Sequence, residues 1–272
     1  AVLQNLVDQK FPVNDDMKED AATIIKQIKS AYKSNYGDNY KDSLNQALTS
    51  AGYKNLSEYR QKMIKQIQYA NFLLDYIDDH FDDVFNDYYQ QCAPKYVSLI
   101  KISVSDTSSP TDDETSKLNE VKELISNTDK SFGDIAQDYS NDSTSSKKGS
   151  LGIVDSKDTS GIANSYGKDV FNAIEALSEG QVSDVITGDN GYYFVKVTST
   201  DKKTLKKELK KTDIDSPLLA YDDYLQYVVY NSYKINYKDK DIKKIVQEVV
   251  NKALEERKDG CCSLYFFWIL EC

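Results

Sequence analysis

The sequence has few of the residues on which metal and nucleophile chemistry depends. Its 272 residues include one histidine, His80, and four cysteines, three of which fall within the last twelve positions. No cysteine pair has zinc-ligand spacing, and a Ser-His triad would need His80, around which nothing supports one. Four nearby aspartates leave a metal site at His80 open, although a lone histidine among surface acids is more often solvated. Phosphate loops and nucleophile elbows are also missing, so we predict neither a metal nor a cofactor.

Long apolar runs and a surplus of basic residues are missing too. No stretch of 18 apolar residues occurs, which argues against a transmembrane helix, and no signal peptide is visible. The chain starts inside an apparent helix, so we expect it to begin within a longer natural chain. It has 34 basic and 44 acidic residues, a net charge of −10. This charge disfavours nucleic acid as a partner, because phosphate neutralisation needs a basic face.

Hydrophobic periodicity divides the chain into three parts. Apolar residues recur at helical spacing over residues 17–91 and again from residue 204. Between these parts, residues 96–104 alternate as a strand does, and the Gly-Asp-Asn-Gly turn at 188–191 predicts a hairpin joining strands at 182–187 and 192–198. Residues 151–154 read as a short central strand. A helix starting after an N-cap at Ser57 is also expected.

We therefore predict an α+β fold in which a four-stranded antiparallel sheet with helices, residues 95–200, is inserted in an all-α lobe. The lobe is built from both chain ends, residues 1–94 and 201–259. Residues 260–272 hold seven consecutive apolar residues and the only tryptophan. They do not match this pattern, and we interpret them as a cloning remnant, with a natural interaction tail as the alternative.

Two segments carry a resemblance to a known family. Residues 132–152 read FGDIAQDYSNDSTSSKKGSLG, and residues 191–197 read GYYFVKV after a Leu-Ser-Glu-Gly-Gln-Val stretch at 177–182. This order resembles parvulin prolyl isomerases. With the flanking helices, the layout is similar to PrsA-type extracellular foldases, and more distantly to the SurA type, over about residues 1–258. The resemblance implies a parvulin domain inserted in a helical chaperone lobe.

The same resemblance supplies candidate site residues. The two family histidines are replaced here, by Lys101 in the first strand and by Tyr193 in the last. Asp142 matches the family's Cys/Asp position, and Phe171 lies within about one residue of the aromatic position that contacts the substrate proline. We expect Lys101 and Asp142 to pair, with the Tyr193 hydroxyl as a donor. Each could instead have an ordinary role, Asp142 in a turn, Lys101 on an exposed strand and Tyr193 in strand packing.

Prolyl isomerisation needs no proton transfer, because no bond breaks; its barrier of about 18–20 kcal/mol is rotational. A histidine base is therefore not obligatory, but a changed pocket misplaces the groups that favour the twisted amide. We expect isomerase activity to be weak or lost. The 21 tyrosines could line a cradle for peptides, or they could reflect compositional bias alone.

Three functions follow from the resemblance. The first is a foldase or chaperone for unfolded or partly folded secreted polypeptides; the second is an active prolyl isomerase with a divergent site; the third is a non-catalytic surface interaction protein. The expected location is the outer face of the cell membrane of a Gram-positive bacterium. A lipid anchor would precede residue 1, and it would be the only link to the membrane. A homodimer stays open.

Overall fold

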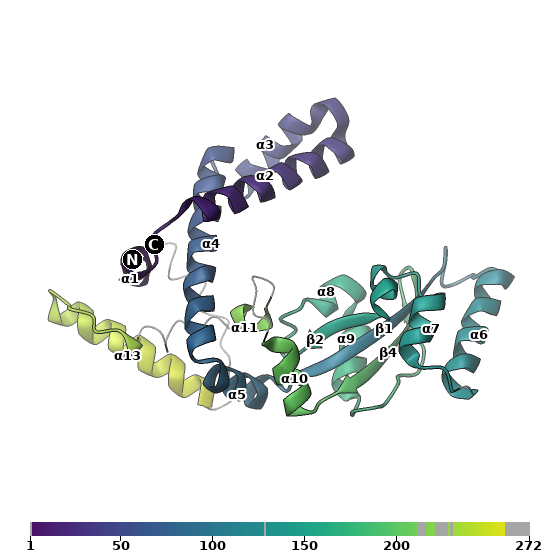
Figure 1. The fold of residues 1–272 in the computed structure, drawn as a ribbon. Helices are drawn as coiled ribbons and strands as arrows, with labels where there is room; N and C mark the ends of the chain where they lie inside the picture. Colours follow the sequence, from purple (N-terminus) through teal and green to yellow (C-terminus); the bar gives the residue numbers. More distant parts are fainter. Residues whose placement is uncertain (1, 128, 211–215, 221–227, 229–230, 259–272) are drawn as a thin grey trace. The chain divides into compact units, whose positions relative to one another are not determined.

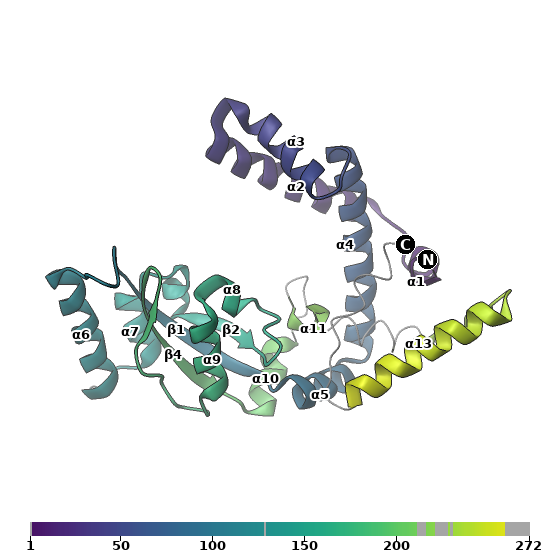
Figure 2. The same cartoon turned by 180° about the vertical axis from the view of Figure 1, so that it is seen from behind.

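The computed structural model describes residues 2–127, 129–210, 216–220, 228 and 231–258, which form two compact units (Figures 1 and 2). The first, here called the helical unit, holds residues 2–80 with the described part of 228–258. The second, the sheet unit, holds residues 81–210 and 216–220. Most of residues 222–233, within the helical stretch predicted from residue 204, and the whole segment 260–272 lie outside the described residues. Within the described part, no helix is both long and apolar enough to cross a membrane.

The helical unit begins with α1 (Val2–Lys10), α2 (Asp15–Tyr36), η1 (Gly37–Asn39), α3 (Tyr40–Ser50) and α4 (Leu56–Asp79), and it ends with α13 (Lys240–Lys258). The α4 helix starts two residues earlier than predicted. Its N-cap is Asn55, whose side chain accepts a hydrogen bond from the Glu58 N–H at 3.0 Å, so the expected cap at Ser57 is wrong. Asparagine and serine are equally good caps, and the local pattern did not separate them.

The core of the helical unit is formed where one face of α2 packs on α4. Its buried residues repeat at helical spacing on both helices: Met17, Ala21, Ile25, Met63, Ile64 and Ile67. Parts of the unit that are distant in sequence also meet. The Tyr233 ring lies 6.1 Å from the Phe72 ring, and Lys10 Nζ lies 5.4 Å from the Tyr233 centroid. Segments from before and after the sheet unit therefore share one helical unit.

The sheet unit contains a four-stranded antiparallel sheet in the order β2-β1-β4-β3, which confirms the predicted α+β class. The strands are β1 (Lys95–Ser103), β2 (Ser150–Val154), β3 (Ile186–Gly188) and β4 (Gly191–Ser199). The hairpin at 188–191 forms as predicted, with Gly188 opposite Gly191. Two expectations are wrong: β2 is an edge strand rather than a central one, and the strand predicted at 182–187 is reduced to β3 and an isolated bridge at Val182.

Helices cover both faces of the sheet, as Figures 1 and 2 show from opposite sides. On one face, α6 (Asp112–Asn127) and α7 (Phe132–Tyr139) pack on alternate residues of β1, among them Ile100 and Ile102. On the other face, α8 (Ile162–Tyr166) and α9 (Lys168–Ala176) pack on Val97 and Leu99. Because successive strand residues point to opposite faces, β1 buries apolar side chains on both faces of the sheet.

Further helices complete the sheet unit: α5 (Phe81–Cys92), η2 (Ser143–Lys147), α10 (Lys202–Leu209) and α11 (Pro217–Ala220). The α5 helix is joined to the unit by buried polar contacts. The Tyr88 hydroxyl donates to Asp155 Oδ2 at 2.7 Å, and Cys92 O accepts a hydrogen bond from the Ser156 N–H at 2.8 Å. The sheet unit thus begins at Phe81, whereas the predicted domain begins at residue 95.

Candidate functional site

A cavity of about 660 Å³ lies on the α8/α9 face of the sheet. Three sequence-predicted site residues line it: Lys101 from β1, Asp142 from the turn before η2, and Tyr193 from β4. The rest of its wall comes from α8, the start of α9 and the β3–β4 hairpin. These residues are far apart in the chain, and the sheet and its covering helices bring them to one place.

Lys101 and Tyr193 are directly opposite each other on adjacent antiparallel strands. Lys101 Nζ lies 5.7 Å from the Tyr193 ring centroid, within the range of a cation–π contact. The Tyr193 side chain is buried and its hydroxyl donates to Asn190 Oδ1 at 2.8 Å. A Cβ at Gly188 would lie 2.6 Å from the Tyr193 ring, so glycine is needed there for the ring to fit.

Asp142 is held by its neighbours in sequence. Its side chain caps η2 by accepting from Thr144 N at 2.9 Å and from Thr144 Oγ1 at 2.6 Å. Its own N–H donates to Ser140 Oγ at 3.2 Å. Among the described residues Lys101 and Asp142 form no ion pair, so the expected pair is wrong. A local cap satisfies the carboxylate without ordering a long lysine side chain, which would cost conformational entropy.

Tyr166, at the end of α8, is a site residue that the sequence analysis missed. Its hydroxyl donates to Asp142 Oδ1 at 3.4 Å, and its ring meets the Tyr193 ring edge-on at 6.2 Å. Burial, followed by the nearby Asp142 charge, raises the pKa of Tyr166 to about 12. The sequence signal for it was the glycine at position 167, directly after the tyrosine. In the structure Gly167 ends α8 with a φ of +102°. Tyr166, and not Lys101, links the Asp142 and Tyr193 positions.

Phe171 does not reach the cavity wall that the structure describes. Its half-buried side chain packs against the core under α9, whereas Val170 and Ile186 supply the apolar part of the wall. Most of the other lining side chains are polar or charged, including Lys168 and Asp169. The cavity is therefore suited to a polar chain segment with one small apolar group, rather than to a large apolar ligand.

His80 belongs to the helical unit, where its ring stacks on Tyr76 at 4.2 Å and its Nδ1 lies 3.0 Å from Tyr76 O. Within the described ranges, no three His, Cys, Asp or Glu residues are grouped as metal ligands. The candidate site offers hydrogen-bonding groups and charges of both signs, but no imidazole.

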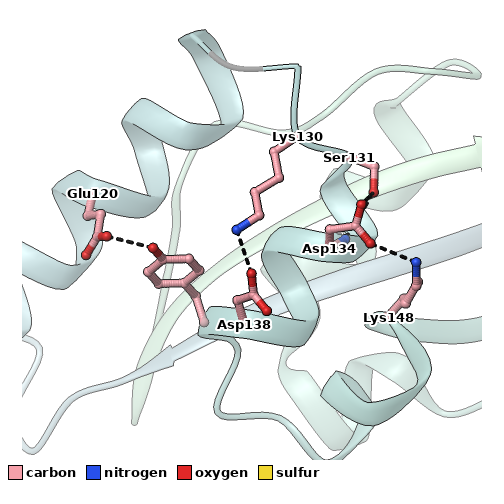
Figure 3. A network of polar contacts seen from close by, with 7 residues as sticks. Glu120, Lys130, Ser131, Asp134, Asp138 and Lys148 are labelled. Atoms are coloured by element: carbon pink, nitrogen blue, oxygen red, sulfur yellow. Dashed lines mark hydrogen bonds and ion pairs between the residues drawn. The ribbon is translucent and has the colours of Figure 1, made fainter.

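The face of the sheet unit opposite the cavity carries an exposed polar network around α7 (Figure 3). Lys148, just after η2, pairs with Asp134 at 2.7 Å, and Lys130 pairs with Asp138 at 2.5 Å. The Lys148 hydrogen bond lowers the pKa of Asp134. Exposed pairs contribute little stability singly. The Lys148–Asp134 pair connects the end of the 140–148 loop, which carries Asp142, to α7.

Comparison with known proteins shows what this domain is similar to. Residues 99–199 match the family model "Rotamase: PPIC-type PPIASE domain". Similar proteins include the foldase protein PrsA of Staphylococcus aureus, strain bovine RF122 / ET3-1, which is 32% identical over 151 residues, 53% of this chain and 44% of that protein. PrsA of Staphylococcus epidermidis, strain ATCC 35984, is 32% identical over 141 residues, 49% of this chain and 41% of that protein.

Similar solved structures include PrsA from Bacillus subtilis, which is 22% identical in sequence. The match covers 89% of this chain and 84% of that chain, with a TM-score of 0.38. PrsA from Streptococcus pneumoniae is 19% identical, covers 91% and 86%, and has a TM-score of 0.41. The chain spans less than half the length of the curated relatives it matches. The family and sequence matches confirm the parvulin-type domain and the predicted similarity to PrsA-type foldases.

Proposed function

We propose that this chain, with its parvulin-type domain, is the folding-assistance part of an exported PrsA-type foldase. It binds unfolded or partly folded secreted polypeptides and delays their aggregation. Its isomerase activity is weak. The observation that carries the proposal is the cavity that Lys101, Asp142 and Tyr193 line together. The resemblance assigns these three positions to the family's active site, in which Lys101 and Tyr193 would replace the two histidines.

The contacts in this cavity support weak catalysis. Rotation about a prolyl bond is accelerated by groups that hold the proline and stabilise the twisted amide more than the planar one. Here the Tyr193 hydroxyl is engaged by Asn190, and the Asp142 carboxylate by Thr144 and Tyr166. The Lys101 ammonium lies over the Tyr193 ring instead of pairing with a carboxylate. The site can hold a chain, but the Tyr193 hydroxyl and the Asp142 carboxylate already have partners within the protein.

A second candidate is an active isomerase with a divergent site. It is favoured by the Tyr166–Asp142–Thr144 hydrogen bonds, which form a polar network where the family has a different one. Because isomerisation requires positioning and no base, such a network suffices if its geometry matches the twisted amide. The third candidate is a non-catalytic surface interaction protein, which would show neither isomerisation nor suppression of aggregation.

The proposed location is outside the cell membrane, with a lipid anchor in a segment before residue 1, and the proposed host is a Gram-positive bacterium. Support comes from the relatives, which are foldase proteins of staphylococci. Dimerisation is proposed on the same family basis alone.

Two assays run side by side test the proposal. In a protease-coupled isomerisation assay on a proline peptide series, we expect a rate barely above the uncatalysed one. In an aggregation assay with an unfolded client, we expect suppression that survives Asp142→Asn. Strong isomerisation that Asp142→Asn abolishes establishes the second candidate instead. Absence of suppression at every ratio of protein to client overturns the chaperone proposal.

A further inference from the structure

A groove of about 580 Å³ in the helical unit is lined by α2, the start of α3 and the start of α4. Its floor is apolar, with contributions from Ala22, Ile25 and Leu56. Four cationic residues line it as well: Lys26, Lys29, Lys33 and Arg60. We call it the basic groove. All of its walls belong to the helical unit, so it is separate from the cavity at Lys101 and Tyr193.

The charge of the basic groove is opposite to that of the chain. The protein has a net charge of −10, yet residues 21–36 contain three lysines and no acid, and residues 59–74 contain Arg60, Lys62 and Lys65 and no acid. The three groove lysines follow a spacing of three and four residues, which places them along one side of α2. Like charges gathered in this way repel one another, so the arrangement is unfavourable unless an anion shares it.

The cations of the basic groove have no acidic partner among the described residues. The ion pairs of the helical unit involve other lysines, such as Lys18 with Asp15 and Lys65 with Asp8. Arg60 donates only a long hydrogen bond, 3.4 Å, to the carbonyl oxygen of Lys18. The lysine side chains are exposed, so they remain available to a ligand.

Helix stability alone does not explain this charge pattern. Cations are favoured in the last turn of a helix, which accounts for Lys33 near the end of α2. Lys26 and Lys29 lie further inside the helix, beyond the reach of that effect. Arg60 follows the first turn of α4, at the end of a helix where positive charge is not favoured.

We propose that the basic groove binds acidic, unstructured polypeptide segments that also carry apolar side chains. Carboxylates would pair with the lysines and Arg60 on the rim, and an apolar side chain would cover Ile25 and Leu56 on the floor. The aliphatic parts of the lysines extend this apolar surface. The groove volume falls in the range of about 300–1,000 Å³ typical of ligand sites. A purely anionic polymer would satisfy the rim but leave the floor uncovered.

This inference deepens the proposed folding-assistance function, because it names the class of client segment and where that segment binds. Binding should be strongest at low salt, since rim charges in contact with solvent are screened over about 10 Å at 0.1 M salt. Electrostatic attraction should also raise the association rate more than it lowers the dissociation rate.

The test uses the full chain and three fluorescent peptides of equal length that form no structure. One combines Glu and Leu in an irregular order, one replaces each Glu of that peptide with Lys, and one replaces each Leu with Ser. Fluorescence anisotropy gives Kd at 50 and 300 mM NaCl. The groove variant is Lys26→Gln/Lys29→Gln/Lys33→Gln. The control variant, Lys41→Gln/Lys54→Gln/Lys62→Gln, removes the same charge from exposed lysines of the helical unit that do not line the groove.

We expect the Glu/Leu peptide to bind at least tenfold more tightly than either other peptide at 50 mM NaCl. The groove variant should weaken its binding at least tenfold and the control variant less than threefold, with circular dichroism unchanged in both. Equal effects of the two variants overturn the groove assignment. If the Glu/Ser peptide binds as tightly as the Glu/Leu peptide, the site is a general anion site and the proposed ligand class is wrong.

Client aggregation, measured with the same variants, separates this inference from the proposed function. Groove-dependent peptide binding in a protein that suppresses no aggregation supports the inference and overturns the folding-assistance proposal. Suppression of aggregation without groove-dependent peptide binding supports the folding-assistance proposal and overturns the inference about the groove.

Discussion

Lys101 and Tyr193 are cross-strand partners on β1 and β4, and the lysine ammonium lies 5.7 Å from the tyrosine ring centroid. Under the proposal above, the pair occupies the two positions at which the family has histidines. In this pair the buried ring of Tyr193 packs against the half-buried side chain of Lys101. The contact joins the two strands, and the Tyr193 hydroxyl, which donates to Asn190, is not free for a substrate.

Tyr193 variants should separate the ring from the hydroxyl. Tyr193→Phe removes only the hydrogen bond to Asn190, so unfolding free energy should fall by about 1 kcal/mol. Tyr193→Ala removes a buried ring from the α8/α9 core and should cost about 3–5 kcal/mol. Urea unfolding followed by circular dichroism measures both. Equal costs for the two variants would mean that the hydroxyl, and not ring packing, holds the residue.

Gly149 is required by its backbone conformation and by close contact. Its φ is +73°, and an added Cβ would lie 2.4 Å from Leu99 O. Gly152, with φ +78° and open space around it, is a matched control. Gly152→Ala should cost about 1–2 kcal/mol, the penalty for a left-handed residue. Gly149→Ala should cost about 1–3 kcal/mol more, because of overpacking. Unfolding of the two variants by urea, compared directly, checks the difference; equal costs would contradict the close contact.

Tyr88 joins α5 to the sheet unit through a buried hydrogen bond to Asp155. Burial, then the Asp155 charge, raises the pKa of Tyr88, so the hydroxyl stays protonated as a donor. Tyr88→Phe should destabilise the protein by about 1–3 kcal/mol, because a fully buried carboxyl group loses a partner.

The neighbouring Tyr89→Phe is the control for this prediction. Its hydroxyl donates to Thr200 O in a partly buried position, so the loss should be only about 0.5–1.5 kcal/mol. Calorimetry should give a lower Tm for Tyr88→Phe than for Tyr89→Phe. The reverse order would show that Asp155 is held by its other donors alone.

The sheet unit shows which features are predictable from sequence and which are not. The strand β1, the helix α7 and the β3–β4 hairpin were predictable, because each depends on periodicity or turn residues within a few positions. The edge place of β2 was not, since a short apolar run reads the same at the edge or the centre of a sheet. The docking of α5 depends on Tyr88 and Asp155, 67 residues apart, and no local pattern predicts such a pair.

The candidate site divides in the same way. Family spacing predicted that Lys101, Asp142 and Tyr193 would lie near one another, and all three line one cavity. Their partners were not predictable, because each polar group selects the nearest available donor or acceptor. Asp142 is satisfied by Thr144, two residues away, and by Tyr166, so the expected contact with Lys101 does not form.

Glu114 closes a capping box at the start of α6 and also holds the end of β1. Its carboxylate accepts from Thr111 N at 2.7 Å and from Ser105 N at 2.8 Å, while Thr111 Oγ1 accepts from the Glu114 N–H at 3.2 Å. Backbone hydrogen bonds from Thr111 and then Ser105 lower the pKa of Glu114 to about 2, from its ordinary 4.5. The ionised form is the one that the fold prefers.

The sign of the pH dependence follows from this shift. A carboxyl group with a lowered pKa in the folded protein stabilises the fold fully above its ordinary pKa, and the stabilisation is lost as pH falls through the folded value. We therefore expect Glu114→Gln to lower the unfolding midpoint of the protein at pH 5 and above. The difference from wild type should shrink between pH 4.5 and 2, because wild-type Glu114 then becomes neutral too. Comparing the two proteins at each pH cancels the titration of all other groups.

Carbon-13 NMR of the Glu114 carboxyl should give a titration midpoint near pH 2. A midpoint near pH 4.5, together with a stability difference that does not change with pH, would show that the capping box does not depend on charge.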